Sequence, residues 1–356
     1  MGDAATPELV TPAELQLAAR NHGLPLEALR YPVTPVGLHY LLIHYDIPAV
    51  DAGAWRLAVD GEVERPLSLS LDDLAALPRA DVISTMECAG NGRARLSPRP
   101  VSQPWLLEAV GTAHWSGVSL RAVLERAGLR GSAREVLFTG LDGGVEGGVE
   151  QRYQRALALD EALRDEVLLA TGMNGAPLPP QHGFPLRLVV PGWYGMTSVK
   201  WLASVTVLDR PFEGYQHERA YRLRLDEDDE GTPVTRMQPR ALMVPPGEPE
   251  FLTRERTVRS TPVVLEGRAW SGWAPIVSVE VSVDGGESWD AAELREDVDS
   301  RWAWRSWRYE WSPAPGRYVV ACRAADGAGN RQPAEPIWNV GGYENTAPQQ
   351  VVVDVS

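Results

Sequence analysis

The chain has 356 residues, of which 44% are hydrophobic and 23% charged, and its formal net charge is −14. This length predicts two domains, and the composition is typical of an ordinary globular protein. The acidic balance argues against nucleic acid and anionic lipid as partners, because both are polyanions. The first residues lack the regions of a signal peptide and no apolar run could cross a bilayer, so we expect a cytoplasmic protein, or a periplasmic one if a leader has been removed.

The first part of the chain mixes short helices with short strands. Residues 11–14, Thr-Pro-Ala-Glu, form a capping box with proline at the first helical position, and predict a helix that Gly23 stops. Two further helices are predicted, one between Ser70 and Pro78 and one over residues 119–127. Strands are predicted at 56–59, 82–86, 135–139, 186–190 and 199–208. Because the two types do not alternate regularly, we predict an α+β domain rather than a doubly wound sheet.

The sequence pattern changes at the end of this domain, from mixed helices and strands to closely spaced strands. An acidic run at 226–230 and the following prolines predict a boundary, so that the domains cover residues 1–238 and 239–356. Beyond it, strands are predicted at 263–270, 277–283, 302–311, 317–324, 336–340 and 350–355. Strands at this density predict an all-β, immunoglobulin-like sandwich. The tryptophan- and arginine-rich stretch 301–307 is expected to face the first domain or a second subunit.

Cys88 opens an unusual loop for so acidic a chain. From Cys88 to Trp105 there is no Asp or Glu, and the loop carries Arg93, Arg95 and Arg99. A thiol among guanidinium groups is expected to have a lowered pKa and to exist as the thiolate, which binds metals and attacks electrophiles. The arginines also offer planar donors to an oxyanion. The sequence therefore predicts a chemical site at Cys88.

The second cysteine carries a different expectation. Cys322 lies in an alternating strand pattern and is predicted to be a small buried residue, and nothing in the spacing favours a disulfide with Cys88. No Cys-x-x-Cys-His motif is present, which excludes covalent c-type haem. No phosphate-binding glycine motif opens a helix, so nucleotide is not expected.

A second informative window lacks carboxylates entirely. Between Leu168 and Leu208 there is no Asp or Glu, where the chain average would place about 5.5 (48/356 × 41). The window keeps cationic and hydroxyl side chains, namely His182, Arg187, Ser198 and Lys200. Cations without carboxylates are what a buried phosphate pocket requires. The alternative is a hydrophobic strand–turn–strand whose basic ends are solvated.

Other signals are weaker. Asn174-Gly175 predicts a type I′ hairpin turn. His39 and His44 lie near tyrosines, but no further Cys or His completes a zinc site. Asp142, in a glycine-rich segment, belongs either to a plain turn or to a loop that hydrogen-bonds a ligand.

Several of these segments resemble a known family. Residues 88–93, 182–187 and 198–201 resemble signature segments of the sulfite oxidase family, the molybdopterin enzymes that include assimilatory nitrate reductase. Residues 282–289, 302–305 and 337–339 resemble its C-terminal immunoglobulin-like dimerisation domain. The resemblance implies a sulfite-oxidase-type molybdopterin-binding domain followed by this sandwich, and a homodimer formed through it. Neither a haem nor a flavin domain is visible, so an external electron carrier, such as a cytochrome, is implied.

The resemblance also implies roles for the matched side chains. Cys88 would be the protein thiolate that binds molybdenum, one metal per chain, and soft thiolates suit that metal. The pterin and its phosphate would be held by His44, Asp142, His182, Arg187, Ser198 and Lys200. The pocket for a small oxyanion substrate would be lined by Arg93, Trp105 and Arg305. The reaction implied is oxygen-atom transfer, with the cofactor supplying the difficult step.

The chain departs from the family pattern at three positions. A tyrosine that acts near the metal is matched to Thr171, and two pocket arginines are replaced by Leu42 and Gly92. Fewer cations favour a less charged substrate. The leading prediction is the oxidation of sulfite to sulfate; the alternatives are reduction of a sulfoxide or nitrate-like oxyanion, a metal-free thiol enzyme in which Cys88 is the nucleophile, and a non-catalytic interaction protein.

Overall fold

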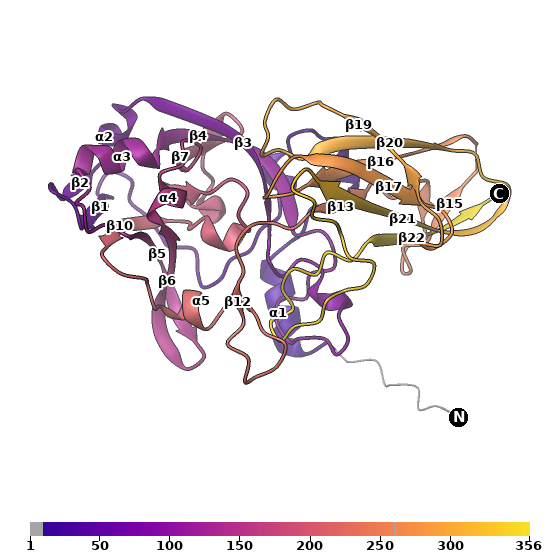
Figure 1. Cartoon of the computed structure of the whole chain (residues 1–356), viewed down its shortest axis with the longest axis horizontal. Helices are drawn as coiled ribbons and strands as arrows, with labels where there is room; N and C mark the ends of the chain where they lie inside the picture. Colours follow the sequence, from indigo (N-terminus) through magenta and orange to yellow (C-terminus); the bar gives the residue numbers. More distant parts are fainter. Residues whose placement is uncertain (1–9, 260) are drawn as a thin grey trace.

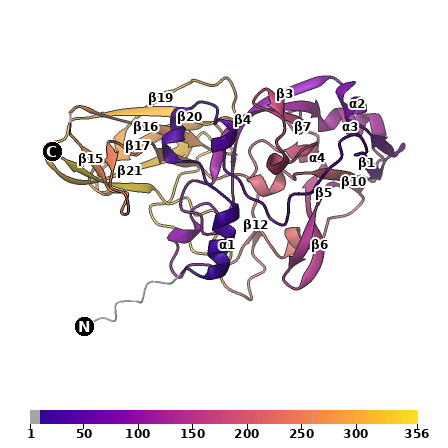
Figure 2. The same cartoon turned by 180° about the vertical axis from the view of Figure 1, so that it is seen from behind.

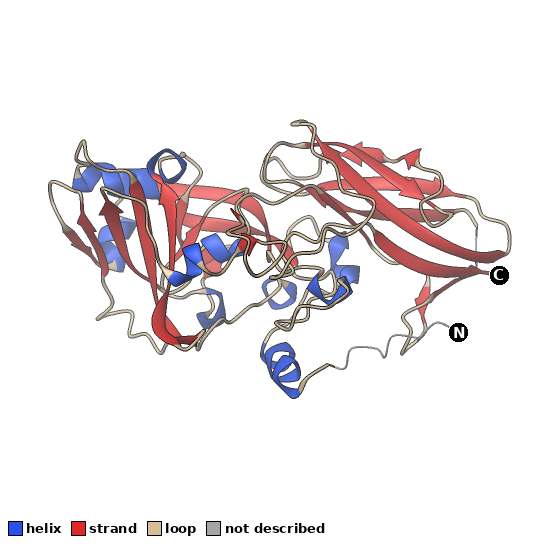
Figure 3. Cartoon of the chain, turned by 60° about the horizontal axis from the view of Figure 1, so that its bottom comes forward, coloured by secondary structure: helices blue, strands red, loops and turns tan. Residues whose placement is uncertain are grey.

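The computed structural model describes residues 10–259 and 261–356. Two parts lie side by side in Figure 1, an N-terminal part (residues 10–238) and a C-terminal part (residues 239–356). Figure 3 shows that strands dominate both and that the helices are short. The helices are α1 (Pro12–Arg20), α2 (Leu71–Ala75), α3 (Leu120–Ala127), α4 (Leu159–Ala162) and α5 (Tyr215–Glu218). Among the described residues, no helix has the length and apolar character needed to span a membrane.

Two sheets form the frame of the N-terminal part. The first has the order β2 (Leu67–Leu69), β1 (Leu57–Gly61), β10 (Leu202–Leu208), β5 (Glu135–Glu146) and β6 (Val149–Ala158). The second has the order β3 (Arg79–Glu87), β4 (Val110–Ser119), β7 (Leu168–Met173) and β8 (Ala176–Pro177), with β9 (Arg187–Val189) also paired to β7. A large apolar core includes residues of both sheets and the buried face of α3. These sheets hold the loops that build the site.

The C-terminal part is a two-sheet sandwich. One sheet has the order β13 (Arg240–Met243), β16 (Val263–Trp270), β20 (Arg305–Trp311) and β19 (Glu293–Arg295). The other has the order β14 (Glu248–Pro249), β15 (Arg256–Val258), β22 (Gln349–Val355), β21 (Gly316–Asp326), β17 (Ile276–Ser282) and β18 (Asp290–Ala291). Inward-facing side chains of both sheets form one apolar cluster. A small hairpin of β11 (Arg222–Leu223) and β12 (Thr232–Pro233) precedes the sandwich.

Most predicted elements are confirmed. The predicted capping box begins α1, which ends at Arg20 rather than at Gly23. The predicted helix after Ser70 is α2, which a second capping box begins, and Gly128 ends α3 with a φ of 75°. Asn174 and Gly175 both have positive φ between β7 and β8, as a type I′ turn requires. Cys322 is buried in β21, and both cysteines are free. The sandwich is confirmed as two packed sheets, whereas its immunoglobulin-like topology stays a prediction.

Some elements differ from the predictions. Residues 336–340 form no strand, because this segment crosses to the N-terminal part, where the Trp338 indole donates to the Pro98 carbonyl at 2.7 Å. The strands β4, β6 and β7 were not predicted. The N-terminal part is consequently mostly β with a few short helices, rather than a balanced α+β mixture.

The two parts are joined by buried polar contacts. Glu87, fully buried at the end of β3, accepts hydrogen bonds from the Arg240 guanidinium of β13 and, at 2.8 Å, from the Trp270 indole of β16. The tryptophan-rich segment faces the N-terminal part, since the backbone N–H of Trp304 donates to the Thr85 hydroxyl at 2.8 Å. Figure 2 shows α1 beside this junction. The junction is therefore part of the folded core and not a loose linker.

Candidate functional site

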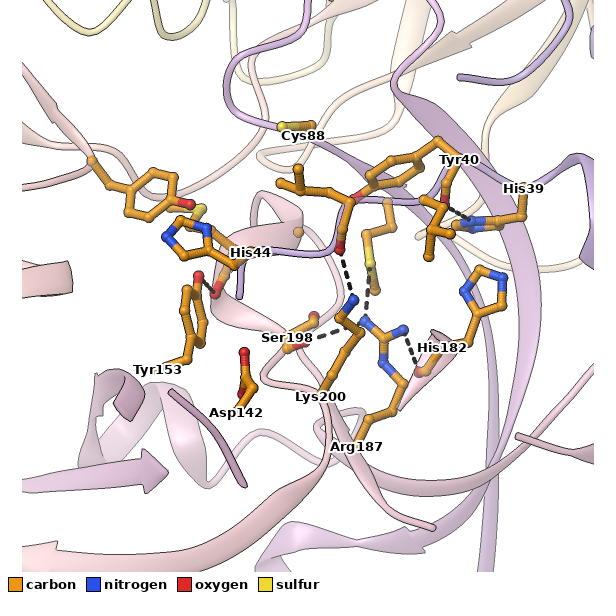
Figure 4. A pocket seen from close by; sticks show the side chains of 16 residues that line it. His39, Tyr40, His44, Cys88, Asp142, Tyr153, His182, Arg187, Ser198 and Lys200 are labelled. Carbon is orange, nitrogen blue, oxygen red and sulfur yellow. Dashed lines mark hydrogen bonds between the residues drawn. The ribbon is translucent and has the colours of Figure 1, made fainter. Parts of the chain in front are cut away.

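A pocket in the N-terminal part brings together residues from distant stretches of the chain (Figure 4). Its walls come from the 39–44 segment, the end of β3, β5, β6 and the carboxylate-free window. Of the predicted site residues, seven line it: His44, Cys88, Asp142, His182, Arg187, Ser198 and Lys200. The three members of the expected oxyanion pocket do not.

Cys88 begins the loop that follows β3. Its backbone N–H donates to the Ala109 carbonyl at 2.9 Å, and its own carbonyl accepts the N–H of Asn91, so a tight turn fixes the sulfur. Only 8% of the residue is exposed. Burial raises the pKa of the Cys88 thiol, although the nearby Arg93 charge opposes the shift. The expectation of a lowered pKa was therefore wrong, because desolvation outweighs the guanidinium.

Arg187, at the start of β9, is a buried cation held by neutral groups. Its guanidinium donates to the carbonyls of His182 at 3.0 Å and Ser198 at 3.2 Å, and lies 4.7 Å over the Trp115 ring. Its Nε has no hydrogen-bond partner. Burial lowers the pKa of Arg187 to about 10. The Ser198 hydroxyl accepts the Val190 N–H at 3.1 Å, which leaves its own hydrogen free to donate.

Lys200 lies beside Arg187 with the same kind of surroundings. Its Nζ donates to the carbonyls of Leu42 at 2.6 Å and Gln181 at 3.3 Å, and lies 4.3 Å from the Trp201 ring centroid. Burial and the like charge of Arg187 lower the pKa of Lys200 to about 7. Within the described residues, neither cation has a carboxylate within ion-pair distance. The two cations thus lie side by side without a direct ion pair, and the Asp142 carboxylate acts on Lys200 only at longer range.

Two histidines in the pocket are neutral at ordinary pH. Burial lowers the pKa of His182 to about 2, with the charges of Arg187 and Lys200 adding to the effect. Burial also lowers the pKa of His39 to about 4; its ring lies 5.6 Å from that of His182. The Nε2 of His39 has no hydrogen-bond partner. The Nδ1 of His39 donates to the Tyr40 carbonyl at 3.0 Å, so the Nε2 of the neutral ring is left as an acceptor for a ligand.

Asp142 and His44 close the opposite side of the pocket (Figure 4). Asp142 lies where the pairing of β5 with β6 is interrupted, so its side chain leaves the sheet. Burial raises the pKa of Asp142 to about 6, and its Oδ1 has no hydrogen-bond partner. The Nε2 of His44 lies 2.9 Å from Glu146 Oε2, which leaves its other nitrogen for the pocket. The structure thus favours a ligand loop over a plain turn at Asp142.

Arg93 and Trp105 lie next to Cys88 but outside the pocket wall. The Arg93 guanidinium donates to the carbonyls of Gly341 at 2.9 Å and Gln103 at 3.1 Å. A Cβ at Gly90 would come within 2.6 Å of that guanidinium, so glycine is required for the close approach. Trp105 belongs to the same buried cluster as Cys88. Both remain near enough to influence what binds at the sulfur.

The structure corrects the expectation for Arg305. This residue begins β20 and donates to the Ile276 carbonyl at 2.7 Å, and it forms an ion pair with Glu296 at 3.4 Å. It lines a separate hollow in the C-terminal part, together with Arg295 and Arg301. Its neighbours on the sheet therefore hold it away from Cys88, and the pocket assignment was wrong.

The structure also corrects the expected loss of a tyrosine. Thr171 lies on β7 and lines a different hollow, so it does not stand where a residue near Cys88 would. Tyr40, Tyr153 and Tyr221 line the pocket instead. The hydroxyl of Tyr153 donates to the Met196 carbonyl at 2.7 Å. These tyrosines, and His39, were missed as site residues because no motif marks their segments.

Gly92 has a structural reason of its own. Its φ is 93°, and a Cβ there would come within 2.8 Å of the Asn345 carbonyl oxygen. The Asn345 amide donates back to the Gly92 carbonyl at 2.7 Å. The glycine therefore allows the C-terminal segment to pack on the Cys88 loop, and its presence is explained without reference to substrate.

Comparison with family models agrees with this architecture. An oxidoreductase molybdopterin binding domain matches residues 44–216, which span the pocket. A Mo-co oxidoreductase dimerisation domain matches residues 232–356, which span the sandwich and support a homodimer. The solved structure of the sulfane dehydrogenase SoxCD from Paracoccus pantotrophus covers 100% of this chain and 95% of that one, with a TM-score of 0.78 and 23% identity. That likeness concerns the fold.

Curated relatives are more similar in sequence. Sulfite oxidase of Gallus gallus is 38% identical over 348 residues, covering 88% of this chain and 72% of the relative. Mitochondrial sulfite oxidase of Rattus norvegicus is 36% identical, covering 91% and 62%. A nitrate reductase of Hordeum vulgare is 33% identical, covering 91% of this chain but 39% of that protein. The chain therefore belongs to the sulfite oxidase family of molybdopterin-dependent oxidoreductases.

Proposed function

We propose that this molybdenum-dependent oxidoreductase oxidises sulfite to sulfate and passes the electrons to a carrier outside this chain. The reaction adds one oxygen atom, taken from water, and releases two electrons and two protons. The observation that carries the proposal is the pocket itself, where the Cys88 thiol and two cations without a direct ion-pair partner, Arg187 and Lys200, line one cavity. Tyrosines line this cavity, Tyr221 among them, so Thr171 does not weaken the case for sulfite.

The residues present fit a molybdopterin. Its phosphate needs cations that carboxylates have not neutralised, and Arg187 and Lys200 donate only to carbonyls and to a thioether sulfur. Its ring N–H groups need acceptors, and Asp142 Oδ1 is buried without a partner. A molybdenum ion accepts soft sulfur ligands, and Cys88 supplies one from the protein.

Each residue can be given a task on this basis. Arg187, Lys200 and Ser198 would bind the phosphate, and His182, His44 and Asp142 would orient the pterin. Cys88 would bind the metal, whose centre supplies two-electron oxygen-atom transfer when bound. The positive charge of Arg93 would attract an anion towards the sulfur, and the Tyr221 hydroxyl can donate a hydrogen bond to it. Burial of the pocket excludes bulk water and strengthens these interactions.

Reduction of a sulfoxide or a nitrate-like oxyanion is the second candidate. It is favoured by the apolar Leu42 in the pocket wall, where the family pattern has an arginine, and by the similarity to nitrate reductase. A metal-free thiol enzyme is disfavoured, since burial raises the pKa of Cys88 and such an enzyme needs the reverse.

A steady-state screen tests the proposal. Holoenzyme is assayed with sulfite and ferricyanide as electron acceptor, and in the reducing direction with dimethyl sulfoxide or nitrate and a viologen donor. We expect saturable sulfite oxidation, with a kcat/KM at least about tenfold above that for either reduction, in proportion to bound molybdenum. Faster turnover of nitrate or the sulfoxide would replace sulfite by the second candidate.

A further inference from the structure

Four side chains contact one another in a column beside Cys88, and its two central rings are tilted against each other. The Arg93 guanidinium lies 5.2 Å from the Tyr343 ring centroid. The rings of Tyr343 and Tyr221 lie 5.3 Å apart with an interplanar angle of 33°. On the far side, the Arg155 guanidinium lies 5.5 Å from the Tyr221 ring centroid. Two cations thus enclose two phenol rings, and one of these rings, Tyr221, lines the pocket.

Arg155 has no evident structural partner for its charge. The residue is 2% exposed, and its Nε has no hydrogen-bond partner. One Nη donates to the Gln216 carbonyl, and within residues 10–259 and 261–356 no carboxylate forms an ion pair with it. Burying an unpaired cation is costly, so a protein that retains one usually has an anion for it to act on.

The column connects both parts of the molecule at the sulfur. Tyr343 comes from the C-terminal part, and Gly342 beside it would place a Cβ within 2.7 Å of the Arg93 side chain. Tyr221 has a φ of 51°, a conformation that non-glycine residues rarely adopt. Close packing at Gly342 and an uncommon backbone at Tyr221 together fix the rings between the guanidiniums. The charges are therefore held in place in advance of any ligand.

We infer that Arg155 is a specificity-determining, positioning residue that supplies positive charge, through Tyr221, to a small divalent oxyanion bound at the Cys88 end of the pocket. The two guanidiniums act together, one on each side of the ring pair. Leu42 and Gly92 offer no charge where the family pattern has arginines, and Arg155 provides a cation from a different strand, β6. The inference depends on the proposed oxyanion site, but not on sulfite being turned over.

Equilibrium binding of inorganic sulfate to the holoenzyme tests this inference. Sulfate is titrated calorimetrically at constant ionic strength into wild-type protein, Arg155→Gln and Arg155→Lys. Glutamine can still donate to the Gln216 carbonyl but carries no charge. The Arg155→Gln variant lacks the positive charge, so its Kd for sulfate is expected to be about 5- to 10-fold higher than that of the wild type. The Arg155→Lys variant keeps the charge, so its Kd should stay within about 2-fold of the wild-type value.

Control variants separate charge from structure. Arg210→Met removes the same charge at an exposed position, with 82% of the side chain accessible, and should leave the Kd for sulfate unchanged. If Arg155→Gln does not fold, Tyr343→Leu serves in its place. It removes one of the two rings between the guanidiniums, the ring that contacts Arg93, and should raise the Kd for sulfate about 3-fold.

Three outcomes would overturn the inference: wild-type protein that binds no sulfate, an Arg155→Gln variant whose Kd equals that of the wild type, or an Arg155→Lys variant that binds as weakly as Arg155→Gln. The two proposals can fail separately. If the enzyme does not oxidise sulfite but its sulfate binding depends on the charge at position 155, the proposed substrate is rejected and the inference is supported.

Discussion

Single side chains in the pocket are governed by desolvation more than by neighbouring charge. Arg93 stabilises the Cys88 thiolate, yet burial still raises the pKa of the thiol. A metal ion would reverse this balance, because a coordinated thiol loses its proton outright. Cys88 is therefore suited to be a ligand and poorly suited to be a free nucleophile.

Replacing Cys88 tests that role. The Cys88→Ser variant should keep its fold, with a thermal midpoint within a few degrees of wild type, because serine is nearly isosteric. Its activity should fall by at least about 10³-fold, since the hard oxygen is a poor substitute for a soft thiolate. Metal analysis of the wild type should find about one molybdenum per chain. Normal turnover by the variant would refute the ligand role.

The buried histidines predict a pH dependence of the cofactor-free protein. Burial lowers the pKa of His39 to about 4 and that of His182 to about 2, whereas unfolded histidine titrates near 6.5. From pH 6.5 down to 5 the unfolded chain therefore binds protons at both positions and the folded chain does not. Each of these histidines should lower the free energy of unfolding by about 1.4 kcal/mol per unit as the pH falls. His217, with its pKa lowered to about 4, adds to this slope, whereas Asp142 and Glu344, with pKa values raised to about 6 and 7, oppose it.

Urea denaturation at several pH values measures this slope. The slope of the His182→Gln variant should be smaller than that of the wild type by about 1.4 kcal/mol per pH unit, the contribution of one histidine. A variant slope equal to that of the wild type would show that His182 does not contribute.

Elements from the two parts meet at Glu87. The carboxylate at the end of β3 accepts from Arg240 on β13 and Trp270 on β16, and also from the Asn91 amide at 2.9 Å. Because Glu87 directly precedes Cys88, these contacts fix the start of the Cys88 loop. The C-terminal part thus supports the site as well as packing against it.

Removing one member of this buried pair should be severe. Arg240→Met leaves the Glu87 carboxylate buried without its cation and is expected to lower the free energy of unfolding by about 3–5 kcal/mol. Adding Glu87→Gln should recover part of the loss. The matched surface change Arg308→Met, which breaks a pair with Glu310, should cost no more than about 1 kcal/mol. Urea denaturation of the wild type and these three variants provides the comparison, and equal losses for the two arginines would contradict the argument.

Prediction of these elements from sequence succeeded where the signal was local. Capping boxes and an Asn-Gly turn depend on neighbouring residues, and these features were found. β4 is buried along most of its length and β6 points Arg155 inwards, so neither shows the alternation of a half-buried strand. Tyr221 and Arg155 were missed, and Arg305 was misplaced, for a related reason. Tertiary packing, which no local pattern encodes, decides which of these side chains lies near Cys88.

The whole molecule separates its charges. The net charge is −14, yet the carboxylate-free window folds into the interior and supplies most of the pocket cations. Acidic groups lie largely outside, where they are solvated. An anionic substrate is therefore repelled by the negative surface before the pocket cations attract it. Its association rate constant should increase with salt concentration, because salt screens the surface charge.

Assembly is a property of this same scale. Because residues 232–356 match a dimerisation domain, the full chain should sediment at twice its mass of 39.0 kDa. Analytical ultracentrifugation over a range of protein concentrations measures this. A single species at the mass of one chain, at micromolar concentration, would refute the dimer.

The packing at Gly92 limits how this pocket can be redesigned. An engineer who wished to imitate the relatives by introducing arginine there would force a side chain against the Asn345 carbonyl, and would push the C-terminal segment away from the loop that presents the sulfur. Introducing an arginine at position 92 therefore requires redesign of the segment around Asn345, more than two hundred positions downstream.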